Sequence, residues 1–376
     1  MEVHMKKLVI VLVIFTLLAT FSVFAGGKQE EKAAAKEEKT EEKAAEQEQE
    51  KEELPGEGVL VGMATDVGGL GDKSFNDGAW AGLQKAEEEL GVEPRVIQSN
   101  QMTDYVPNLS GLADDGCKVV FGVGFLMADA ILEVANNYPD TYFGGIDIFV
   151  DPGSAPENLV GILYKEEQSG YLAGVVAGLM TKEYADASPK FNDENVVGCV
   201  LGMDIPPVER FEVGFYEGVK SVNPDCKVIS VVTNSFEDQA KGKEAALGMI
   251  EQGADIIFQI AGLTGLGAIN AAKEEGVAAI GVDVDQNYVA PETVITSAVK
   301  GITESTYLVV EGAVNGTLEG GKTYTYGIKE DSTGLAPFHS FDDVIPQEVK
   351  DIVNERIEKM KSGEITVSDT REKAGM

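Results

Sequence analysis

Residues 59–90 read VLVGMATDVGGLGDKSFNDGAWAGLQKAEEEL. The apolar, β-branched run from Val59 to Ala64 predicts a short buried strand, and a turn rich in glycine and aspartate follows it. From Phe75 to Leu90 the apolar residues recur at spacings of three and four, which predicts a helix with one apolar face. A strand followed by such a helix is the repeating unit of a parallel α/β sheet.

The same alternation of strands and helices continues through the chain in two consecutive series. The first series has expected strands at Val59–Ala64, Arg95–Ser99, Lys118–Val123, Thr141–Ile146 and Leu159–Tyr164, followed by a helix at Gln168–Met180. The second has expected strands at Val196–Leu201, Lys227–Val232, Asp255–Ile260, Ala278–Val282 and Val294–Ser297, with helices at Arg210–Ser221, Asp238–Gln252, Gly265–Glu275 and Ile302–Thr317. Two series of similar size predict two similar α/β lobes with a cleft between them.

The N-terminus has the pattern of a secretion signal. A pair of lysines precedes an apolar run from Leu8 to Phe24, and small residues follow. We expect a signal peptide at residues 1–25, although the run is also long enough to remain as a membrane anchor. Gly26 stands where a lipoprotein signal has its cysteine, so lipidation is not expected. The protein is therefore expected to be exported, to the periplasm or the outer face of the cytoplasmic membrane.

The chain is strongly acidic. Its 376 residues include 64 acidic and 30 basic side chains, with a formal net charge of -34. Residues 26–56 are almost all Glu, Lys, Ala and Gln, have little apolar surface to bury, and are predicted to form a solvated spacer. An acidic chain repels phosphates, so nucleic acid is not an expected partner. The body contains no apolar run long enough for a span, so its insertion into a membrane is not expected either.

Motifs for catalysis and metal binding are missing from the sequence. Cys117, Cys199 and Cys226 have no CxxC spacing, and buried free thiols are the expected state. His339 stands alone in the body, and there is no Walker loop, Gly-x-Ser-x-Gly or metal-ligand spacing. We therefore expect a binding protein that is not an enzyme and has no cofactor or metal.

Aspartates and glycines follow predicted strands in both series. Asp66 and Asp147 follow strands of the first series, and Gly262 and Asp283 follow strands of the second. Ligands of parallel sheets bind beyond the carboxyl ends of the strands, where carboxylates can accept hydrogen bonds and glycine lets the backbone come close. Such residues also simply end strands and cap helices. Their recurrence at several strand ends favours a ligand site.

Two phenylalanines open predicted helices just after strand ends. Phe75 belongs to the first series and Phe211 to the second, so the two rings could hold a flat ligand between the lobes. In the alternative interpretation, each ring packs against its own helix. Ser74 or Asn76 would then cap the first of these helices rather than touch a ligand.

Ordered motifs give the chain a resemblance to a known family. They are Asp66-Val-Gly-Gly, Asp72-Lys-Ser-Phe-Asn, Lys165-Glu-Glu, Gly170-Tyr-Leu-Ala-Gly, Arg210-Phe-Glu, Gly214-Phe, Gly281-Val-Asp-Val-Asp-Gln and Thr296-Ser-Ala-Val-Lys. From about Gly58 to Gly316 the chain resembles the basic membrane protein family of solute receptors, which includes purine nucleoside receptors. The resemblance implies a type I periplasmic binding-protein fold, in which two parallel-sheet α/β lobes are joined by a hinge with several crossings. Many relatives carry a lipid-anchoring cysteine that this chain lacks.

The resemblance also implies a ligand and the residues that contact it. Eight residues are expected at the site: Asp66, Phe75, Asn76, Asp147, Phe211, Gly262, Asp283 and Lys300. Phe75 and Phe211 would stack on a purine, while Asp283 and Lys300 would hold the ribose hydroxyls. The ligand would be a purine nucleoside such as adenosine, guanosine or inosine. The expected partner is an ABC transporter permease, and we expect a monomer.

Chain order predicts hinge crossings near Tyr164, near Lys300 and at Lys322–Tyr326. The first lobe is then 57–164 plus 301–322, the second is 165–300 plus 323–368, and 369–376 form a tail. Two other functions remain open. A sugar or other small-molecule receptor of the same fold is one, and an enzyme that cleaves nucleosides is the other. Such an enzyme would use Asp66, Asp283 or Asp285 as acid or base.

Overall fold

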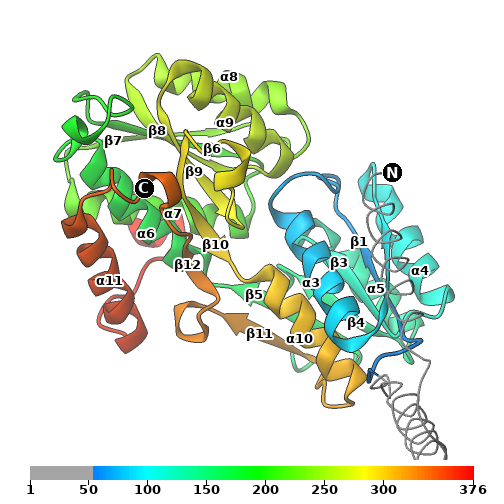
Figure 1. Cartoon of the computed structure of the whole chain (residues 1–376). Helices are drawn as coiled ribbons and strands as arrows, with labels where there is room; N and C mark the ends of the chain where they lie inside the picture. Colours follow the sequence, from blue (N-terminus) through cyan, green and yellow to red (C-terminus); the bar gives the residue numbers. More distant parts are fainter. Residues whose placement is uncertain (1–53) are drawn as a thin grey trace, which may run out of the picture. The chain divides into compact units, whose positions relative to one another are not determined.

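Residues 54–376 are described by the computed structural model, and they contain two separate six-stranded sheets (Figure 1). The strand order is β11-β5-β4-β3-β1-β2 in one sheet and β12-β10-β9-β8-β6-β7 in the other. The signal peptide predicted at 1–25, and the spacer up to residue 53, lie outside the described residues. The predicted fold class, two similar α/β lobes of the type I binding-protein kind, is confirmed.

The first sheet is entirely parallel and has helices on both faces. Its strands are β1 (Leu60–Ala64), β2 (Glu93–Ile97), β3 (Val119–Val123), β4 (Tyr142–Ile146), β5 (Leu159–Tyr164) and β11 (Lys322–Tyr326). Helices α3 (Phe75–Leu90) and α10 (Ile302–Val314) share one apolar core with the sheet. Helices α4 (Tyr105–Asp114) and α5 (Ala128–Asn137) share a second core with it. We call this sheet and its helices lobe 1.

The second sheet is built in the same way, and with its helices it forms lobe 2. Its strands are β6 (Val196–Leu201), β7 (Lys227–Val232), β8 (Ala254–Ile260), β9 (Ala278–Asp283), β10 (Val294–Lys300) and the short antiparallel β12 (Thr333–Leu335). One core contains α6 (Glu166–Met180), α7 (Pro206–Val222) and α11 (Gln347–Ser362), and the opposite one contains α8 (Gln239–Ile250) and α9 (Gly262–Glu275).

Short helices lie in the connections. The 3₁₀ turns are η1 (Met102–Asp104), η2 (Phe125–Met127), η3 (Ala185–Ala187), η4 (Asn287–Val289), η5 (Ile328–Glu330) and η6 (His339–Phe341). The residues predicted as a tail form α12 (Arg371–Ala374) instead. The Arg371 guanidinium pairs with Asp204 and Glu212, so this end of the chain is held against the start of α7.

The chain passes between the two sheets at three places, after β5, after β10 and after β11. The sequence prediction ended the first lobe at residue 322, and this boundary needs correction. Strand β11 pairs with β5 from Lys322 to Tyr326, so all of it belongs to lobe 1. The third crossing therefore begins after Tyr326, because the edge of the first sheet holds the chain up to that residue.

Helices α6 and α7 pack so closely that their backbones touch. A Cβ atom added at Gly174 would lie 2.1 Å from the Phe215 carbonyl oxygen, and one at Gly218 would lie 2.1 Å from that of Tyr171. No side chain fits in either space, so glycine is required at both positions. Because α7 begins beside the cleft, this packing fixes the direction in which its first turn points.

Candidate ligand-binding cleft

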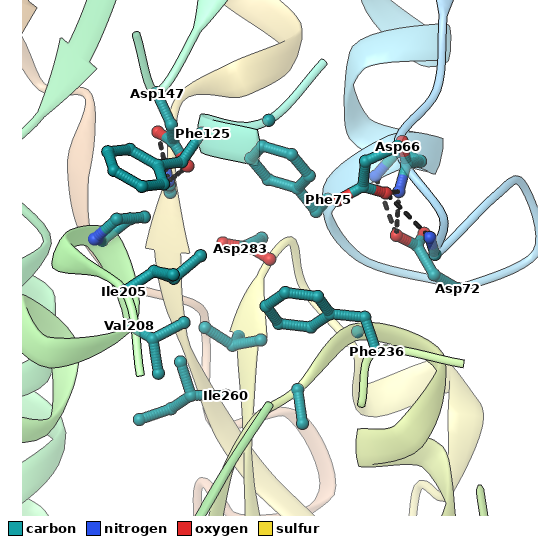
Figure 2. Close-up of a pocket in the computed structure, with 18 of the residues that line it drawn as sticks. Asp66, Asp72, Phe75, Phe125, Asp147, Ile205, Val208, Phe236, Ile260 and Asp283 are labelled. Carbon is teal, nitrogen blue, oxygen red and sulfur yellow. Dashed lines mark hydrogen bonds and ion pairs between the residues drawn. The ribbon is translucent and has the colours of Figure 1, made fainter. Parts of the chain in front are cut away.

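A cavity of about 580 Å³ lies between the two lobes, beyond the carboxyl ends of their central strands (Figure 2). Lobe 1 lines it with Asp66, Gly68, Asp72, Phe75, Asn76, Gly124, Phe125, Leu126 and Asp147. Lobe 2 lines it with Ile205, Pro207, Val208, Phe211, Phe236, Ile260, Ala261, Gly262, Val282, Asp283 and Lys300. The cavity walls are mostly apolar with a few converging polar groups, which is typical of small-molecule sites. All eight residues predicted from the sequence lie at this cavity, and their contacts with a ligand stay predictions.

The loop after β1 arranges the polar groups of lobe 1. Asp66 Oδ1 accepts hydrogen bonds from the Gly68 amide at 2.9 Å and from Asn76 Nδ2 at 3.0 Å. Burial raises the pKa of Asp66 to about 6, although these two hydrogen bonds oppose the shift. Gly124 has a φ of 120°, and a Cβ there would lie 3.1 Å from Asp66 Oδ2. Glycine therefore leaves room beside this carboxylate.

The first turn of α3 is capped by Asp72. Its carboxylate accepts hydrogen bonds from the backbone amides of Ser74 at 3.0 Å, Asn76 at 2.8 Å and Asp77 at 3.1 Å. Ser74 occupies the N-cap position of α3, as one alternative expected, but its side chain makes no capping hydrogen bond and Asp72 binds the amides instead. Because Asp72 satisfies the amides, the side chains of Ser74 and Asn76 can make other contacts. Asn76 Oδ1 is buried and has no hydrogen-bond partner within residues 54–376.

Lys300 is a buried cation at the centre of the site. Its Nζ lies 2.7 Å from Asp147 of lobe 1 and 3.0 Å from Glu166, and only 2% of the side chain is exposed. Burial alone would lower the pKa of Lys300, but the carboxylates of Asp147, Glu166 and Asp283 outweigh burial and raise it. The lysine is therefore charged, and its pair with Asp147 joins the lobes (Figure 2).

Asp283 ends β9 with a left-handed backbone, at φ 66°. Its Oδ2 accepts a hydrogen bond from Ser74 Oγ of lobe 1 at 2.6 Å. Burial raises the pKa of Asp283 to about 7, and nearby Lys300 and the bond from Ser74 oppose this shift. Asp285 instead points away from the cavity and pairs with His339 Nε2 at 2.5 Å. The two aspartates therefore have different surroundings, because β9 ends at Asp283 and Asp285 lies in the turn beyond it.

Aromatic rings from both lobes reach the site. The ring centroids of Phe75 and Phe211 lie 5.1 and 5.9 Å from Lys300 Nζ. Phe211 is only 2% exposed and packs edge-on against Phe258, with centroids 6.2 Å apart. Phe211 therefore belongs to the lobe 2 core as well as to the cavity wall.

Two further phenylalanines at the cavity were not among the eight predicted site residues. Phe125 follows β3, and Phe236 lies in the loop after β7. Figure 2 shows Phe75 and Phe236 projecting into the same space from opposite lobes. Phe125 stands in the stretch Gly122-Val-Gly-Phe at the end of a predicted strand, so the strand-end rule pointed to it. Phe236 lies further along the loop after Val232, where that rule gives a weaker signal.

Two parallel-sheet α/β lobes with a cavity between them define the type I periplasmic binding-protein fold. A solved solute-binding protein of an ABC transporter system from Aeropyrum pernix K1 has the same fold, with a TM-score of 0.74 and 27% identity. The similarity covers 84% of this chain and 95% of that one. Residues 59–371 match the Bmp family, described as ABC transporter substrate-binding protein PnrA-like, and the chain belongs to this family.

Relatives in bacteria and archaea agree with the family. The chain is 32% identical over 325 residues to basic membrane protein A1 of Borrelia garinii subsp. bavariensis, covering 86% of this chain and 92% of that protein. It is 34% identical over 347 residues to an uncharacterised lipoprotein of Pyrococcus abyssi, covering 82% of this chain and 83% of that protein. The resemblance to the basic membrane protein family is thus confirmed.

Three further observations concern only residues 54–376. Cys117, Cys199 and Cys226 are buried free thiols. Across this range, no helix combines the length and the apolar character needed to cross a bilayer. The same part of the chain has no group of three or more His, Cys, Asp or Glu residues placed to hold a metal ion.

Proposed function

We propose that this protein is an exported receptor that captures a purine nucleoside between its lobes and delivers it to an ABC importer. The observation that carries the proposal is the composition of the cavity. Phe75 and Phe236 extend from opposite lobes, while Asp283 and Lys300 lie at adjacent strand ends of lobe 2. An apolar flat base and a polar ribose would each find a matching part of this wall.

The polar groups suit a ligand rich in hydrogen-bond donors. Asp66 and Asp283 are carboxylates that can accept hydrogen from hydroxyl or amino groups. Lys300 can donate to a ribose oxygen with the hydrogen that Asp147 and Glu166 do not use. Carboxylates outnumber the single lysine in the lining, which disfavours phosphorylated ligands by charge repulsion. A neutral nucleoside is therefore preferred over a nucleotide.

The proposed activity is capture without chemistry. Asp66 and Asp283 are held by hydrogen bonds within the protein, and Asp285 lies away from the cavity. Export by the predicted signal peptide would place the receptor outside the cytoplasm, where a lipoprotein relative such as that of Pyrococcus abyssi would also act. A monomer that docks on a transporter permease is the simplest assembly for this role.

A sugar receptor is the second candidate. Carboxylates together with one aromatic face also suit a sugar, and Phe211 is so buried against Phe258 that its ring has little free area for stacking. A sugar would therefore use Phe75 or Phe236 alone, whereas a purine would use a ring on each face.

Isothermal titration calorimetry with the purified full chain tests the proposal. The ligands are inosine, guanosine, adenosine, their free bases, and a panel of pentoses and hexoses. We expect saturable binding of a nucleoside and weaker binding of its free base. Binding of a sugar in place of nucleosides would overturn the nucleoside proposal. Release of free base during incubation, followed by chromatography, would overturn capture without chemistry.

A further inference from the structure

A second set of contacts joins the lobes at the rim of the cleft, apart from the Lys300 pair. Ser74 Oγ of lobe 1 donates to Asp283 Oδ2 at 2.6 Å, and the Val282 carbonyl oxygen lies 3.2 Å from the same hydroxyl. Gln286 Nε2 of lobe 2 donates to the Lys73 carbonyl oxygen at 2.9 Å. We call these contacts the clasp. It connects the loop before α3 with the loop after β9.

Each side of the clasp is held in place within its own lobe. In lobe 1, Asp72 accepts the amide hydrogen of Ser74 and so fixes the loop that carries this hydroxyl. In lobe 2, Gln286 Oε1 accepts from Gln259 Nε2 at 2.6 Å and from the Val282 amide at 2.9 Å. Ser74 and Gln286 are both fully buried. Neither partner therefore has to be ordered when the lobes meet, which reduces the entropic cost of the contact.

The backbone is strained on both sides of the clasp. Lys73 has a φ of 56° and Asp283 a φ of 66°, which residues other than glycine seldom adopt. Such strain persists where the surrounding structure requires it, and it is common at ligand clamps. Here it turns the Lys73 carbonyl oxygen toward Gln286 and the Asp283 carboxylate toward Ser74.

The clasp lies directly beside the cavity. Phe75 and Asn76 follow Ser74 in the chain, and Asp283 itself lines the cavity wall. Gln259 donates to Gln286, and its Oε1 accepts the amide hydrogen of Ala261 at 3.1 Å. Ala261 directly precedes Gly262 of the cavity wall. Closing the clasp therefore orients one oxygen of Asp283 and leaves the other for a ligand.

We propose that Ser74 is a positioning residue, which together with Gln286 holds the lobes closed and orients Asp283 for the ligand. The identity of the ligand rests on the proposed function, whereas the closure of the lobes by the clasp does not. Since the contact forms only when the lobes meet, its loss would speed ligand dissociation and leave association almost unchanged. Loss of a hydrogen bond to a charged acceptor should raise the dissociation rate on the order of tenfold.

The first test is lobe separation in the ligand-free full chain. Nitroxide labels at Glu88→Cys on α3 and Glu244→Cys on α8 report the interlobe distance by pulsed electron spin resonance. Both residues are exposed, whereas the native cysteines are buried. We expect Ser74→Ala to shift the distance distribution toward a more open state. The control is Ser99→Ala, which removes a part-buried hydrogen bond inside lobe 1, donated by Asn108 Nδ2 at 3.0 Å, and should leave the distribution unchanged.

The second test measures inosine binding by stopped flow. Ser74→Ala should dissociate on the order of tenfold faster than wild type, with Ser99→Ala unchanged. Gln286→Glu at pH 8, which keeps the side-chain shape but removes the donor to Lys73, should act in the same direction. Unchanged lobe distances in Ser74→Ala, or equal shifts in Ser99→Ala, would overturn the clasp. If wild type binds none of inosine, guanosine and adenosine, the nucleoside proposal fails, and the ligand-free distances still decide whether the clasp exists.

Discussion

The two lobes line the same cavity with different chemistry. Lobe 1 contributes the carboxylates of Asp66, Asp72 and Asp147 and the amide of Asn76. Lobe 2 contributes mainly apolar side chains, namely Ile205, Pro207, Val208, Phe211, Phe236, Ile260 and Val282. The polar groups of lobe 1 are fixed by hydrogen bonds within loops, whereas the apolar wall of lobe 2 adds burial when the lobes close. Lobe 1 is thus suited to orient a ligand and lobe 2 to enclose it.

The two ionisable residues in the lobe 2 wall sharpen this difference. Lys300 pairs with Asp147, and Asp283 accepts a hydrogen bond from Ser74. Each of them is therefore bound across the cleft by a group of lobe 1. The charged groups of lobe 2 serve both to bind a ligand and to hold the lobes together, so substitutions there should affect both properties.

Lys300→Met should have the largest effect. It leaves Asp147 buried without its paired cation, while Glu166 keeps its pair with Arg210, and breaking a buried pair costs about 3–5 kcal/mol of folding free energy. We expect a large loss of stability in urea unfolding and no measurable nucleoside binding by calorimetry. Lys322→Met is the control, because its pair with Glu319 is solvent-exposed and should contribute little to stability. A stable Lys300→Met variant would show that the interlobe pair is dispensable.

Phe75→Ala and Phe236→Ala test whether the two lobes supply opposed rings. Each should weaken nucleoside binding by about 1–3 kcal/mol through lost stacking, as measured by calorimetry. Phe211→Ala should in addition destabilise the protein, because its ring packs on Phe258 in the core. Phe149→Ala serves as the control, since this ring is 66% exposed and outside the cavity lining. If Phe236→Ala keeps wild-type affinity and Phe211→Ala loses affinity, the two stacking rings are Phe75 and Phe211, as predicted from the sequence.

The pH dependence of binding compares the carboxylates of the two lobes. Without ligand, burial raises the pKa of Asp283 to about 7 and that of Asp66 to about 6. A ligand hydroxyl that donates to the ionised form lowers these pKa values, so binding releases protons. Affinity should therefore fall as the pH decreases from 8 through 7 and 6. Calorimetry in two buffers of different ionisation enthalpy measures the release directly.

Asp283→Asn separates the two contributions. The variant should bind more weakly at pH 8, and the part of the pH dependence near pH 7 should disappear, while the part near pH 6 from Asp66 remains. Stronger binding on acidification of the wild-type protein would mean that the ligand meets a protonated carboxyl group.

Arg371→Ala should have the smallest effect on binding. Its guanidinium pairs with Glu212, whose side chain is only 4% exposed, and this contact holds the start of α7 that carries Pro207 and Val208. Leaving that carboxylate unpaired should lower stability by about 1–3 kcal/mol in urea unfolding, with a smaller loss of affinity than Phe75→Ala. Lys373→Ala, which removes an exposed pair on the same short helix, is the matched control and should change neither property. If Lys373→Ala is as unstable as Arg371→Ala, the loss of stability comes from disturbing α12 as a whole and not from the Arg371–Glu212 pair.

Most of the regular structure was predictable from local pattern. Strands Leu159–Tyr164, Val196–Leu201 and Lys227–Val232 have the predicted bounds, because β-branched runs mark both the two buried strands and the largely exposed edge strand Lys227–Val232. Helix α7 begins at Pro206, earlier than expected, since proline fits the first turn, where no amide hydrogen is needed. Strand β12 has only three residues and is defined by its antiparallel partner β10, so its own sequence carries too little signal.

The predicted site residues end or follow strands or open helices, except Phe211, which lies in the second turn of α7. Chain position alone brings residues at strand ends to the cleft edge of each sheet. The sequence by itself therefore determined the two series, the edge at which a ligand binds and the residue types available there. Only the tertiary structure decided which groups meet across the cleft. Ser74 and Asp283 are 209 residues apart, and Lys300 and Asp147 are 153 apart. Periodicity predicts which side of an element is buried, but a contact between lobes depends on how the surfaces of the two folded lobes fit together.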